Sequence, residues 1–541
     1  MIMNNTKFSN NNLLKGNNVL VILPIISFLG AIWQGQYTDD GYHWGFILSN
    51  ALSLIDGKEP YKEIFIQYGL FSTFLNSIIL IIFNKNIISL IILTSIFYSL
   101  SIYFIGILTK IFTSNIRYAF LSTLTIFLIY PWPVAPWPYF QAFFFAILFC
   151  YFYCHNKIKY SIFSGISLGL AFLSFTTVYS FIVLFFISFI IIFLLISYKN
   201  INKDFIKKNI YFLISFIFTI SIFLIYLIFN DLLENWILYS KLPFFQANIA
   251  ERSIYGNLVD YINFLIFYSS KNFIYEPQWL IYSIFFFANI LFILMMFAKI
   301  YLKKEYSNKN LNLFIFNIFV FLLNILAQIL GIDKFATSIA LGVVSLFSLI
   351  HLIKSYENKL IANFVIIFIS FYSIFFSFSL EGSKYGDSRT AYYKDLKNIN
   401  SKYNQKTIPY FTSQIWSKSS WHTLDEFIKF QNKIKNKCNV KYGANLTNNT
   451  FFFILLDYKK IQLIPFFFKD TGDAFRNYFE PTLISELQKE IDKNNIILIT
   501  AENNDKLLKL NSYNKPLRIN LNIGSKGLSK YAYFYFPKKC V

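Results

Sequence analysis

The chain has 541 residues, of which 56% are hydrophobic, 21% are aromatic and only 14% are charged. A soluble chain of this length is typically about one quarter charged, so the composition excludes an ordinary cytosolic enzyme. The formal net charge of +21 fits the basic inner loops of a membrane protein and their attraction to anionic lipids. No basic soluble module with interleaved aromatic residues is present, so nucleic acid is not an expected partner.

The N-terminus combines a polar tail with an apolar run. Residues 1–17 contain Lys7 and Lys15 but no acid, which is typical of a cytoplasmic tail. The run from about 19 to 33 is not followed by a small-residue cleavage site, so it is predicted to be an uncleaved first membrane helix rather than a signal peptide. Its far end and residues 34–69, the first outer loop, are then expected outside.

The first outer loop combines acids with turn-forming residues. Asp39 and Asp40 follow the first membrane helix closely. Residues 46–55 fit a short helix lying on the membrane surface, with Gly57 just beyond its C-terminus and Asp39 or Asp40 as its N-cap. Two neighbouring carboxylates repel each other unless a cation, a metal ion or a shared proton relieves them, so this pair is also a candidate for chemistry.

Further apolar runs follow, long enough to form membrane helices. Together with the first helix they make twelve runs, which would place both termini on one side of the membrane, whereas the basic loops place the C-terminus outside. Either one short run, with 70–84 the first suspect, does not cross fully or a further crossing lies near 258–268, so 11 to 13 membrane helices are expected. The runs lie near residues 70–84, 87–109, 118–131, 139–154, 160–174, 176–197, 210–230, 278–298, 311–330, 335–352 and 360–380.

Two short basic segments, Lys199–Lys208 and Lys299–Lys309, orient the chain. Both are expected on the inner side of the membrane. Counting outward from them places the loop 231–277, the turn at 331–334 and everything after about 381 outside. We therefore expect a multi-pass protein of the inner cell membrane, with a cytoplasmic N-terminus and an extracytoplasmic C-terminus.

The composition changes near Glu381, where Lys, Asn, Asp and Ser become frequent. This change divides the chain into a membrane domain at 18–380 and a small extracytoplasmic α/β or α+β domain at 381–541. Strands are predicted at Phe451–Leu456, Ile461–Phe467, Ile496–Thr500 and Tyr531–Phe536, and a helix is predicted at Leu483–Asn494.

Two further patterns concern chemical modification of this outer domain. Cys438 and Cys540 are expected to form a disulfide there, because the compartment permits oxidation. Two Asn-x-Thr sequons begin at Asn445 and Asn448 and matter only where a glycosylating pathway exists.

Acidic residues are scarce in the membrane domain. Between Glu63 and Asp204 there is no Asp or Glu. Ion-coupled transporters keep carboxylates within the membrane, so their scarcity argues against an ion-driven transporter. The acids that remain on the outer side lie in the first loop, in the loop 231–277 and at Asp333.

Three short motifs follow one another in the first outer loop: Asp39–Asp40–Gly–Tyr, Gly57-x-x-Pro60–Tyr61 and Gln67–Tyr68–Gly69. Together they resemble the first outer loop of the C-type (GT-C) glycosyltransferases, above all the relatives of the protein mannosyltransferases and of the aminoarabinose transferase that modifies lipid A. The chain departs from that pattern at Asp40, where Glu is common, and at Leu70, where Pro is common. Elsewhere the similarity is one of layout, with many helices followed by an outer domain.

The resemblance implies transfer of a sugar from a polyprenyl-phosphate donor to a lipid, glycan or protein acceptor on the outer face, with inversion. A single in-line displacement needs a carboxylate that accepts the acceptor's proton and a cation near the departing phosphate. The resemblance assigns the base to Asp39. Asp40 would assist by orienting the acceptor or by holding a divalent metal ion together with Asp39, and no other cofactor is implied.

Other outer residues are candidates to contact the substrate. For each of them, a solvated or packed side chain is the alternative interpretation. Candidate cations for the phosphate are Lys241, Arg252 and Lys334. Candidate contacts to the remainder of the substrate are His43, Tyr61 and Tyr68.

Two other classes of function stay open at this point: a lipid or glycan transporter or flippase, and a polysaccharide polymerase or ligase. Polymerases and ligases usually carry their large functional loop late in the chain, which does not predict an acid pair directly after the first helix. A transporter has no evident need of the Gly57-x-x-Pro60–Tyr61 element.

Overall fold

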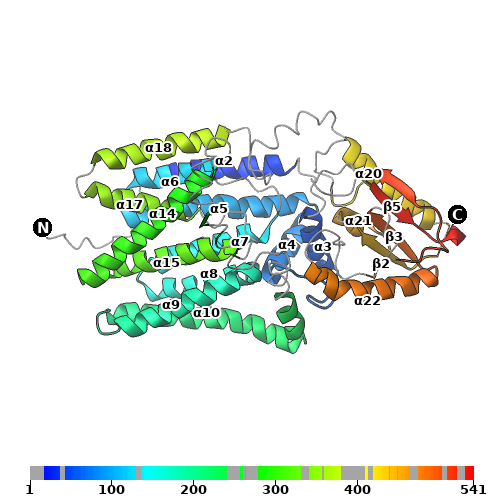
Figure 1. Ribbon diagram of the computed structural model, residues 1–541, viewed down its shortest axis with the longest axis horizontal. Coiled ribbons are helices and arrows are strands. Elements are labelled where there is room, and N and C mark those ends of the chain that lie inside the picture. The colour runs from blue at the N-terminus through cyan, green and yellow to red at the C-terminus, as the bar shows by residue number, and fades with distance from the viewer. Residues whose placement is uncertain are drawn as a thin grey trace.

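The protein consists of a helical bundle followed by a smaller unit with a five-stranded sheet (Figure 1). This arrangement confirms the predicted fold class, a multi-pass α-helical membrane protein with a small mixed C-terminal domain. The computed structural model describes residues 18–36, 43–129, 136–240, 256, 259, 262–263, 278–329, 340–355, 359–378, 408–411, 418–435, 437, 439–447, 449–461, 473–501, 508–520 and 531–540.

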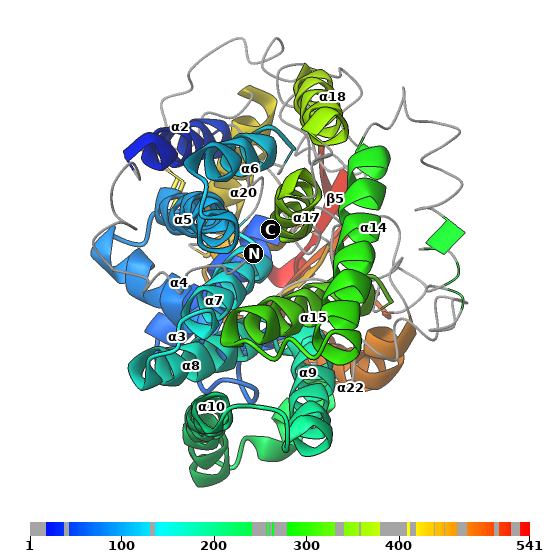
Figure 2. The same cartoon turned by 90° about the vertical axis from the view of Figure 1, so that its left-hand side faces the viewer.

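The apolar runs of the sequence form the helices of the bundle, which Figure 2 shows from the end away from the sheet. Among the described residues, the helices long and apolar enough to cross a membrane are α2 (Asn18–Gly35), α5 (Ile88–Thr113), α9 (Thr176–Ser197), α10 (Lys203–Phe229), α14 (Gln278–Phe297) with its π-helical end η2 (Ala298–Leu302), and α15 (Asn308–Ile329). The further apolar helices are α3 (His43–Ile55), α4 (Leu70–Ile82), α6 (Ile116–Ile129), α7 (Pro138–Tyr153), α8 (Ile158–Ser174), α17 (Gly342–Ser355) and α18 (Lys359–Phe378).

α4 corresponds to the run suspected of not crossing fully. Its 13 residues span about 20 Å at 1.5 Å per residue, less than the ~30 Å hydrocarbon core of a bilayer. The other uncertain crossing, near 258–268, falls almost entirely outside the described residues.

The two basic connections lie at one end of the bundle, away from the sheet (Figure 1). One joins α9 to α10 and the other joins η2 to α15. The Ser197 and Tyr301 hydroxyl oxygens, one from each side, are 3.1 Å apart. The positive-inside rule predicts this end to be cytoplasmic, and the orientation of the chain in the membrane stays a prediction.

A buried lysine links three helices near this end. The Lys208 ammonium of α10 donates to the Tyr153 carbonyl of α7 and, at 2.7 Å, to Asn312 Oδ1 of α15. It also lies 4.1 Å from the centre of the Tyr153 ring. Because these neutral oxygens and the aromatic ring stabilise the buried ammonium group, Lys208 has a structural role as a link between the three helices.

The sheet has the strand order β2-β1-β3-β5-β4. β1 pairs in parallel with both β2 and β3, whereas β5 pairs antiparallel with β3 and β4. Parallel neighbours need a crossover, and α21 and α22 provide the two crossovers. The elements of this unit are α20 (Lys418–Lys435), β1 (Tyr442–Leu446), α21 (Thr450–Leu455), β2 (Lys459–Lys460), α22 (Asp473–Asp492), β3 (Ile496–Ala501), β4 (Leu517–Asn520), β5 (Tyr531–Tyr535) and the 3₁₀ turn η5 (Lys538–Cys540).

The side chains of β3 alternate between the two faces of the sheet. Ile496 and Leu498 pack with α22, whereas Ile499 belongs to the core that α20 covers. α20 and α22 accordingly lie on opposite sides of the sheet (Figure 1).

One strand prediction was wrong. The segment 451–456 was predicted as a strand because three consecutive Phe residues favour one. It is helix α21, all six of whose residues are buried, so no alternation of exposure exists that would favour a strand. The Asn449 side chain caps this helix by accepting from the Phe451 N–H at 3.0 Å.

The other predictions for the C-terminal domain were confirmed in part. β3 and β5 confirm two predicted strands, and the predicted helix at 483–494 is the C-terminal part of α22. Of the strand predicted at 461–467, residues 462–467 lie outside the described part of the chain, and β2 itself covers only Lys459 and Lys460. α20, β1 and β4 were not anticipated.

Candidate functional site

Helix α3 confirms the helix expected in the first outer loop, but it is not a surface helix with one wet face. Its residues from Trp44 to Leu52 are all buried. α4 covers one side of it and α21 of the C-terminal domain covers another. A Cβ atom at Gly45 would lie 1.8 Å from Thr450 Oγ1 of α21, so the two helices touch closely. α3 is therefore held between the bundle and the sheet.

The C-terminus of α3 ends in the way that the sequence predicts. Gly57 has a φ of +79°, in the left-handed region that favours glycine. The Gly57 N–H donates to the Leu54 carbonyl at 3.2 Å, and the Lys58 N–H donates to the Ser53 carbonyl at 3.1 Å. These two bonds form a Schellman motif, which ends the helix and turns the chain back toward the bundle.

Tyr61 occupies a strained position in the second motif. Its φ is +62°, unusual for a bulky residue, and its N–H donates to the Ile64 carbonyl at 3.0 Å. The side chain is 2% exposed and belongs to the same buried cluster as Leu80 of α4. Burial raises the pKa of Tyr61, so the hydroxyl stays protonated. Tyr61 is therefore a packed residue of the loop, and its contact with substrate stays a prediction.

Polar side chains hold the loop against the helices on either side of it. Asn50 Nδ2 of α3 donates to the Phe65 carbonyl at 2.9 Å. Ser77 Oγ of α4 donates to the Ala51 carbonyl at 3.1 Å. Since all of these residues are buried, the bonds are shielded from competing water and give the loop a defined position.

The third motif sits where α4, α8 and α9 meet. A Cβ at Gly69 would lie 2.3 Å from the Leu173 carbonyl oxygen and 2.5 Å from the Ser174 carbonyl oxygen, so only glycine fits. The Tyr68 carbonyl accepts from the Thr176 N–H at 2.8 Å, at the start of α9. The backbone of this motif thus joins three helix ends.

The Tyr68 ring packs edge-on against Phe46, Trp137 and Phe175, with ring centres 5.3 to 6.0 Å apart. It also lines a small pocket between α3, α4 and the start of α7, which holds little more than a water molecule. Amides and hydroxyls supply most of the polar lining of this pocket. These side chains are Asn50, Gln67, Ser72, Thr73 and Asn76.

The segment 233–240 packs against the first loop from the side of α10. Tyr239 contacts Phe65 with ring centres 5.1 Å apart and Tyr61 with ring centres 6.0 Å apart. The Lys62 ammonium donates to the Asn230 carbonyl at 3.0 Å. The chain therefore enters the outer loop that carries Lys241 directly beside the first loop.

A group of charges not anticipated from the sequence lies around the C-terminus of α3. Lys85 pairs with Asp56 at 3.5 Å. The pKa of Lys460 in β2 is lowered to about 8, mainly by burial and also by the nearby Lys58, whereas Asp56 and Asp457 act in the opposite direction. Thirteen residues of helix, about 20 Å, separate this group from the end of α3 that follows the acid pair.

Several predicted site residues lie outside the described part of the chain. They are Asp39, Asp40, Lys241, Arg252, Lys334 and Cys438, together with the side chain of His43. Among the described residues, no three His, Cys, Asp or Glu side chains lie close enough together to hold a metal ion. Asp39 and Asp40 are not among these residues, so their metal role stays a prediction.

The cysteines and sequons can be placed in part. Cys540 is disulfide-bonded, and its pairing with Cys438 stays a prediction. Cys150 and Cys154 are free thiols within the bundle. Asn445 is fully buried and donates to the Asn449 carbonyl at 2.9 Å, so its sequon is inaccessible to a glycosylating enzyme in the folded chain.

No protein-family model matches the chain, and no curated protein matches it. Solved structures share its fold, among them two of one protein. The crystal structure of ArnT from Cupriavidus metallidurans bound to undecaprenyl phosphate has a TM-score of 0.52 at 10% sequence identity, over 97% of this chain and 98% of ArnT. The structure of the same protein in the apo state has a TM-score of 0.53 at 10% identity, over 95% of this chain and 97% of ArnT. The likeness runs through bundle and C-terminal domain alike and confirms the fold that the first-loop motifs predicted.

Proposed function

We propose that this protein is a membrane glycosyltransferase that takes a sugar from a polyprenyl-phosphate carrier and transfers it to an acceptor at the outer face of the membrane. The observation that carries the proposal is the end-to-end likeness to ArnT, which was solved with undecaprenyl phosphate. The three first-loop motifs support the proposal independently of the fold, because they belong to the amino-acid sequence itself.

In this mechanism Asp39 is the general base. It accepts the proton of the acceptor hydroxyl while that oxygen attacks the anomeric carbon, and the lipid phosphate departs from the opposite side, which inverts the centre. The phosphate leaves as a stable anion and needs a cation rather than an acid. Lys241 and Arg252 are the first candidates, since the segment that leads to them packs against the first loop. Lys334 is the next candidate.

Asp40 would orient the acceptor or share a divalent metal ion with Asp39. Two carboxylates suit a hard cation such as Mg²⁺, which commonly takes one or two protein carboxylates and completes its shell with phosphate oxygens and water. His43 begins α3 two residues after Gly41 and is a candidate for contact with the acceptor. Loss of activity on chelation, restored by added Mg²⁺ or Mn²⁺, would support the metal role.

The described residues of the first loop would keep that loop rigid. The Schellman turn at Gly57, the strained Tyr61 and the Gly69 junction hold the loop on three helix ends. A base that is fixed before the substrate arrives needs little reorganisation in the transition state, which is the main contribution that a scaffold makes to such a reaction.

The test is transfer from a panel of radiolabelled polyprenyl-phosphate sugars by the purified protein. Asp39→Asn is expected to lower the turnover by about 10²–10⁴-fold, the usual contribution of a general base. Asp56→Asn is the matched control, because Asp56 belongs to the same loop but pairs with Lys85 at the far end of α3. It is expected to keep turnover within about threefold, as loss of an exposed ion pair has little effect.

The outcomes separate the parts of the proposal. Wild-type turnover by Asp39→Asn would contradict the assignment of the base while leaving the function intact. Absence of transfer by the wild-type protein from every donor in the panel would contradict the function itself.

A further inference from the structure

A second feature with the size and charge of a ligand site lies on the C-terminal domain, at the amino ends of β1 and β2. It is an open pocket with a volume of about 660 Å³. Pockets that hold small molecules in proteins typically measure about 300–1,000 Å³. The lining residues are Lys435, Lys437, Asn439, Val440, Lys441, Asp457, Tyr458 and Lys459.

The lining is strongly basic, with four lysines and one aspartate. Among the described residues, the ion pair in this pocket joins Lys435 to Asp457. Lys437, Lys441 and Lys459 also line the pocket, and none of them forms an ion pair within the described part of the chain, although the charge of Lys441 acts on the Glu490 carboxylate. Like charges gathered in this way repel one another unless an anion relieves them.

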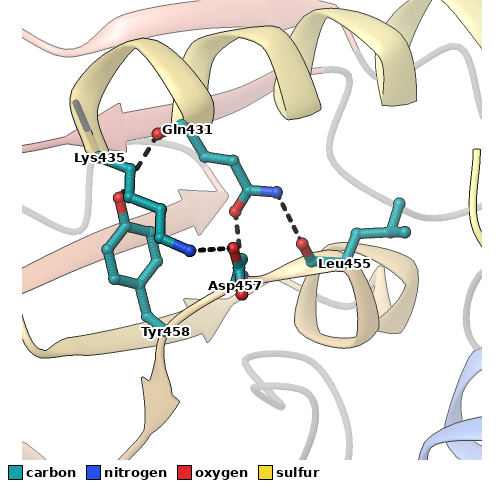
Figure 3. A network of polar contacts seen from close by, with 5 residues as sticks. All are labelled: Gln431, Lys435, Leu455, Asp457 and Tyr458. Carbon is teal, nitrogen blue, oxygen red and sulfur yellow. Dashed lines mark hydrogen bonds and ion pairs between the residues drawn. The ribbon is translucent and has the colours of Figure 1, made fainter.

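A network around Gln431 of α20 holds three of the lining residues, Lys435, Asp457 and Tyr458 (Figure 3). Gln431 is 5% exposed and donates through Nε2 to the Leu455 carbonyl at 2.7 Å. Its Oε1 accepts from the Asp457 N–H at 3.1 Å, and its carbonyl accepts from the Tyr458 hydroxyl at 3.4 Å. The end of α20 and the segment that leads into β2 are thereby held together, and the Lys435–Asp457 pair lies on this support.

Two of the lysines are fixed by the sheet itself. The Lys459 N–H donates to the Lys441 carbonyl at 3.2 Å, where β2 pairs with the entrance of β1. The Lys441 N–H donates in turn to Asn495 Oδ1 at 3.2 Å. The backbones that carry these ammonium groups are therefore set before any ligand arrives, which lowers the ordering cost of binding.

We propose that this pocket binds a phosphate group, carried either by a soluble phosphate ester or by a lipid headgroup. Several ammonium groups match the charge and the tetrahedral shape of a phosphate, whereas a planar carboxylate is better matched by arginine. Asn439, which also lines the pocket, adds a neutral amide donor. A pocket for an uncharged sugar would show a mostly apolar and aromatic lining without this excess of positive charge.

The pocket does not include any residue of the first-loop motifs. One of its lining residues, Asp457, belongs to the charges near the C-terminal end of α3, whereas the acid pair precedes the N-terminal end of that helix in the sequence. Phosphate binding here does not rest on the proposed function, and it can be measured without any sugar donor.

The test uses the purified full-length protein in phosphatidylcholine nanodiscs, with glycerol 1-phosphate titrated in a calorimeter and glycerol as the uncharged control. The variant Lys437→Ala/Lys441→Ala/Lys459→Ala keeps the Lys435–Asp457 pair intact. Glycerol 1-phosphate is expected to bind the wild type, and binding to this variant is expected to be at least tenfold weaker. Lys509→Ala/Lys515→Ala/Lys539→Ala removes the same charge from exposed positions of the same domain outside the pocket, and its affinity should stay within twofold of wild type.

A second arm separates the two sources of phosphate. The wild type and both triple variants are bound to vesicles of phosphatidylglycerol and of phosphatidylcholine. The pocket is assigned to a lipid headgroup if two results are found together. The pocket variant binds phosphatidylglycerol vesicles more weakly than the wild type, and the wild type shows no saturable binding of glycerol 1-phosphate. Saturable binding of the soluble ester assigns it to soluble phosphates. Equal behaviour of the two triple variants in both arms would overturn the proposal, because the effect would then reflect net charge alone.

Discussion

Gly57 and Gly69 both belong to the first-loop motifs, but they are needed for different physical reasons. Around Gly57 there is open space, and what singles it out is a φ of +79°. Gly69 has an extended backbone that any residue adopts, and glycine is needed there because a Cβ atom would collide with the carbonyl oxygens that end α8. Within one loop, glycine is therefore required at one position by its backbone conformation and at the other by close packing.

Gly57→Ala is expected to destabilise the protein by about 1–2 kcal/mol, because an L-residue in the left-handed region carries that conformational cost. Gly57→Asn should lose less, since asparagine tolerates this region better. Thermal unfolding in detergent measures both variants. Equal stability of Gly57→Ala and the wild type would contradict the Schellman turn.

Gly69→Ala is expected to be more damaging than Gly57→Ala, with a loss of about 2–3 kcal/mol or more, because its Cβ meets fixed backbone rather than space. Transfer activity should fall together with the thermal midpoint, since α4, α8 and the loop must move apart. A Gly69→Ala protein that keeps both properties would show that this junction is not tightly packed.

Lys460 carries a pH-dependent contribution to stability. Burial lowers its pKa to about 8, and in the unfolded chain it returns to about 10.4. Between these values the unfolded state binds more protons, so this residue makes stability rise with pH over that window. Below about pH 8 the buried ammonium is charged in both states and its desolvation costs stability.

Lys460→Met is accordingly expected to be more stable than the wild type at pH 7, by on the order of 2–3 kcal/mol. The methionine keeps an apolar contact with the Phe453 ring, over which the ammonium lies at 4.9 Å. Thermal midpoints of both proteins from pH 7 to 10.5 measure the effect, and the difference should shrink as pH rises. A difference that stays constant over this range would contradict the lowered pKa.

At the scale of elements, the contact between α3 and α21 decides where the first loop sits. The two helices are more than 390 residues apart in sequence, and a Cβ at Gly45 would lie 2.9 Å from Thr450 Cβ. Asn449 caps α21 and so fixes the direction from which Thr450 approaches. The C-terminal domain is thereby part of the support of the loop that carries the acid pair.

Gly45→Ala is expected to lower both stability, by about 1–3 kcal/mol for overpacking, and transfer activity. Thr450→Gly removes the atoms that clash, so the double variant Gly45→Ala/Thr450→Gly should recover activity relative to Gly45→Ala alone. A double-variant cycle measures this coupling. Strictly additive losses would show that the two helices do not meet as described.

At the scale of the molecule, the C-terminal domain shares a hydrophobic core with the first loop. Trp44 and Phe65 of the loop belong to the same cluster of buried residues as Phe451 and Phe534 of the sheet unit. The change of composition predicted to divide the chain near residue 381 therefore does not separate two independent hydrophobic cores.

The sequence predicted the bundle well because membrane helices depend on local composition. Each apolar run became a helix, and the Gly57 turn formed where it was expected, since a helix end is specified by a few consecutive residues. The outer domain was predicted less well. The segment 451–456 reads as a strand by propensity, but its burial on all sides removes the periodic pattern on which such a prediction depends.

By itself, then, the sequence determined that this chain is a multi-pass membrane protein and which loop carries an acid pair in a GT-C-like motif. Only the tertiary structure decided that α3 is enclosed by the C-terminal domain, that Lys460 meets Lys58 and that four lysines line one pocket. Patterns of hydrophobicity and turn formation act over a few residues, so they can be read along the chain. Contacts between segments hundreds of residues apart leave no such local pattern and appear only when the chain has folded.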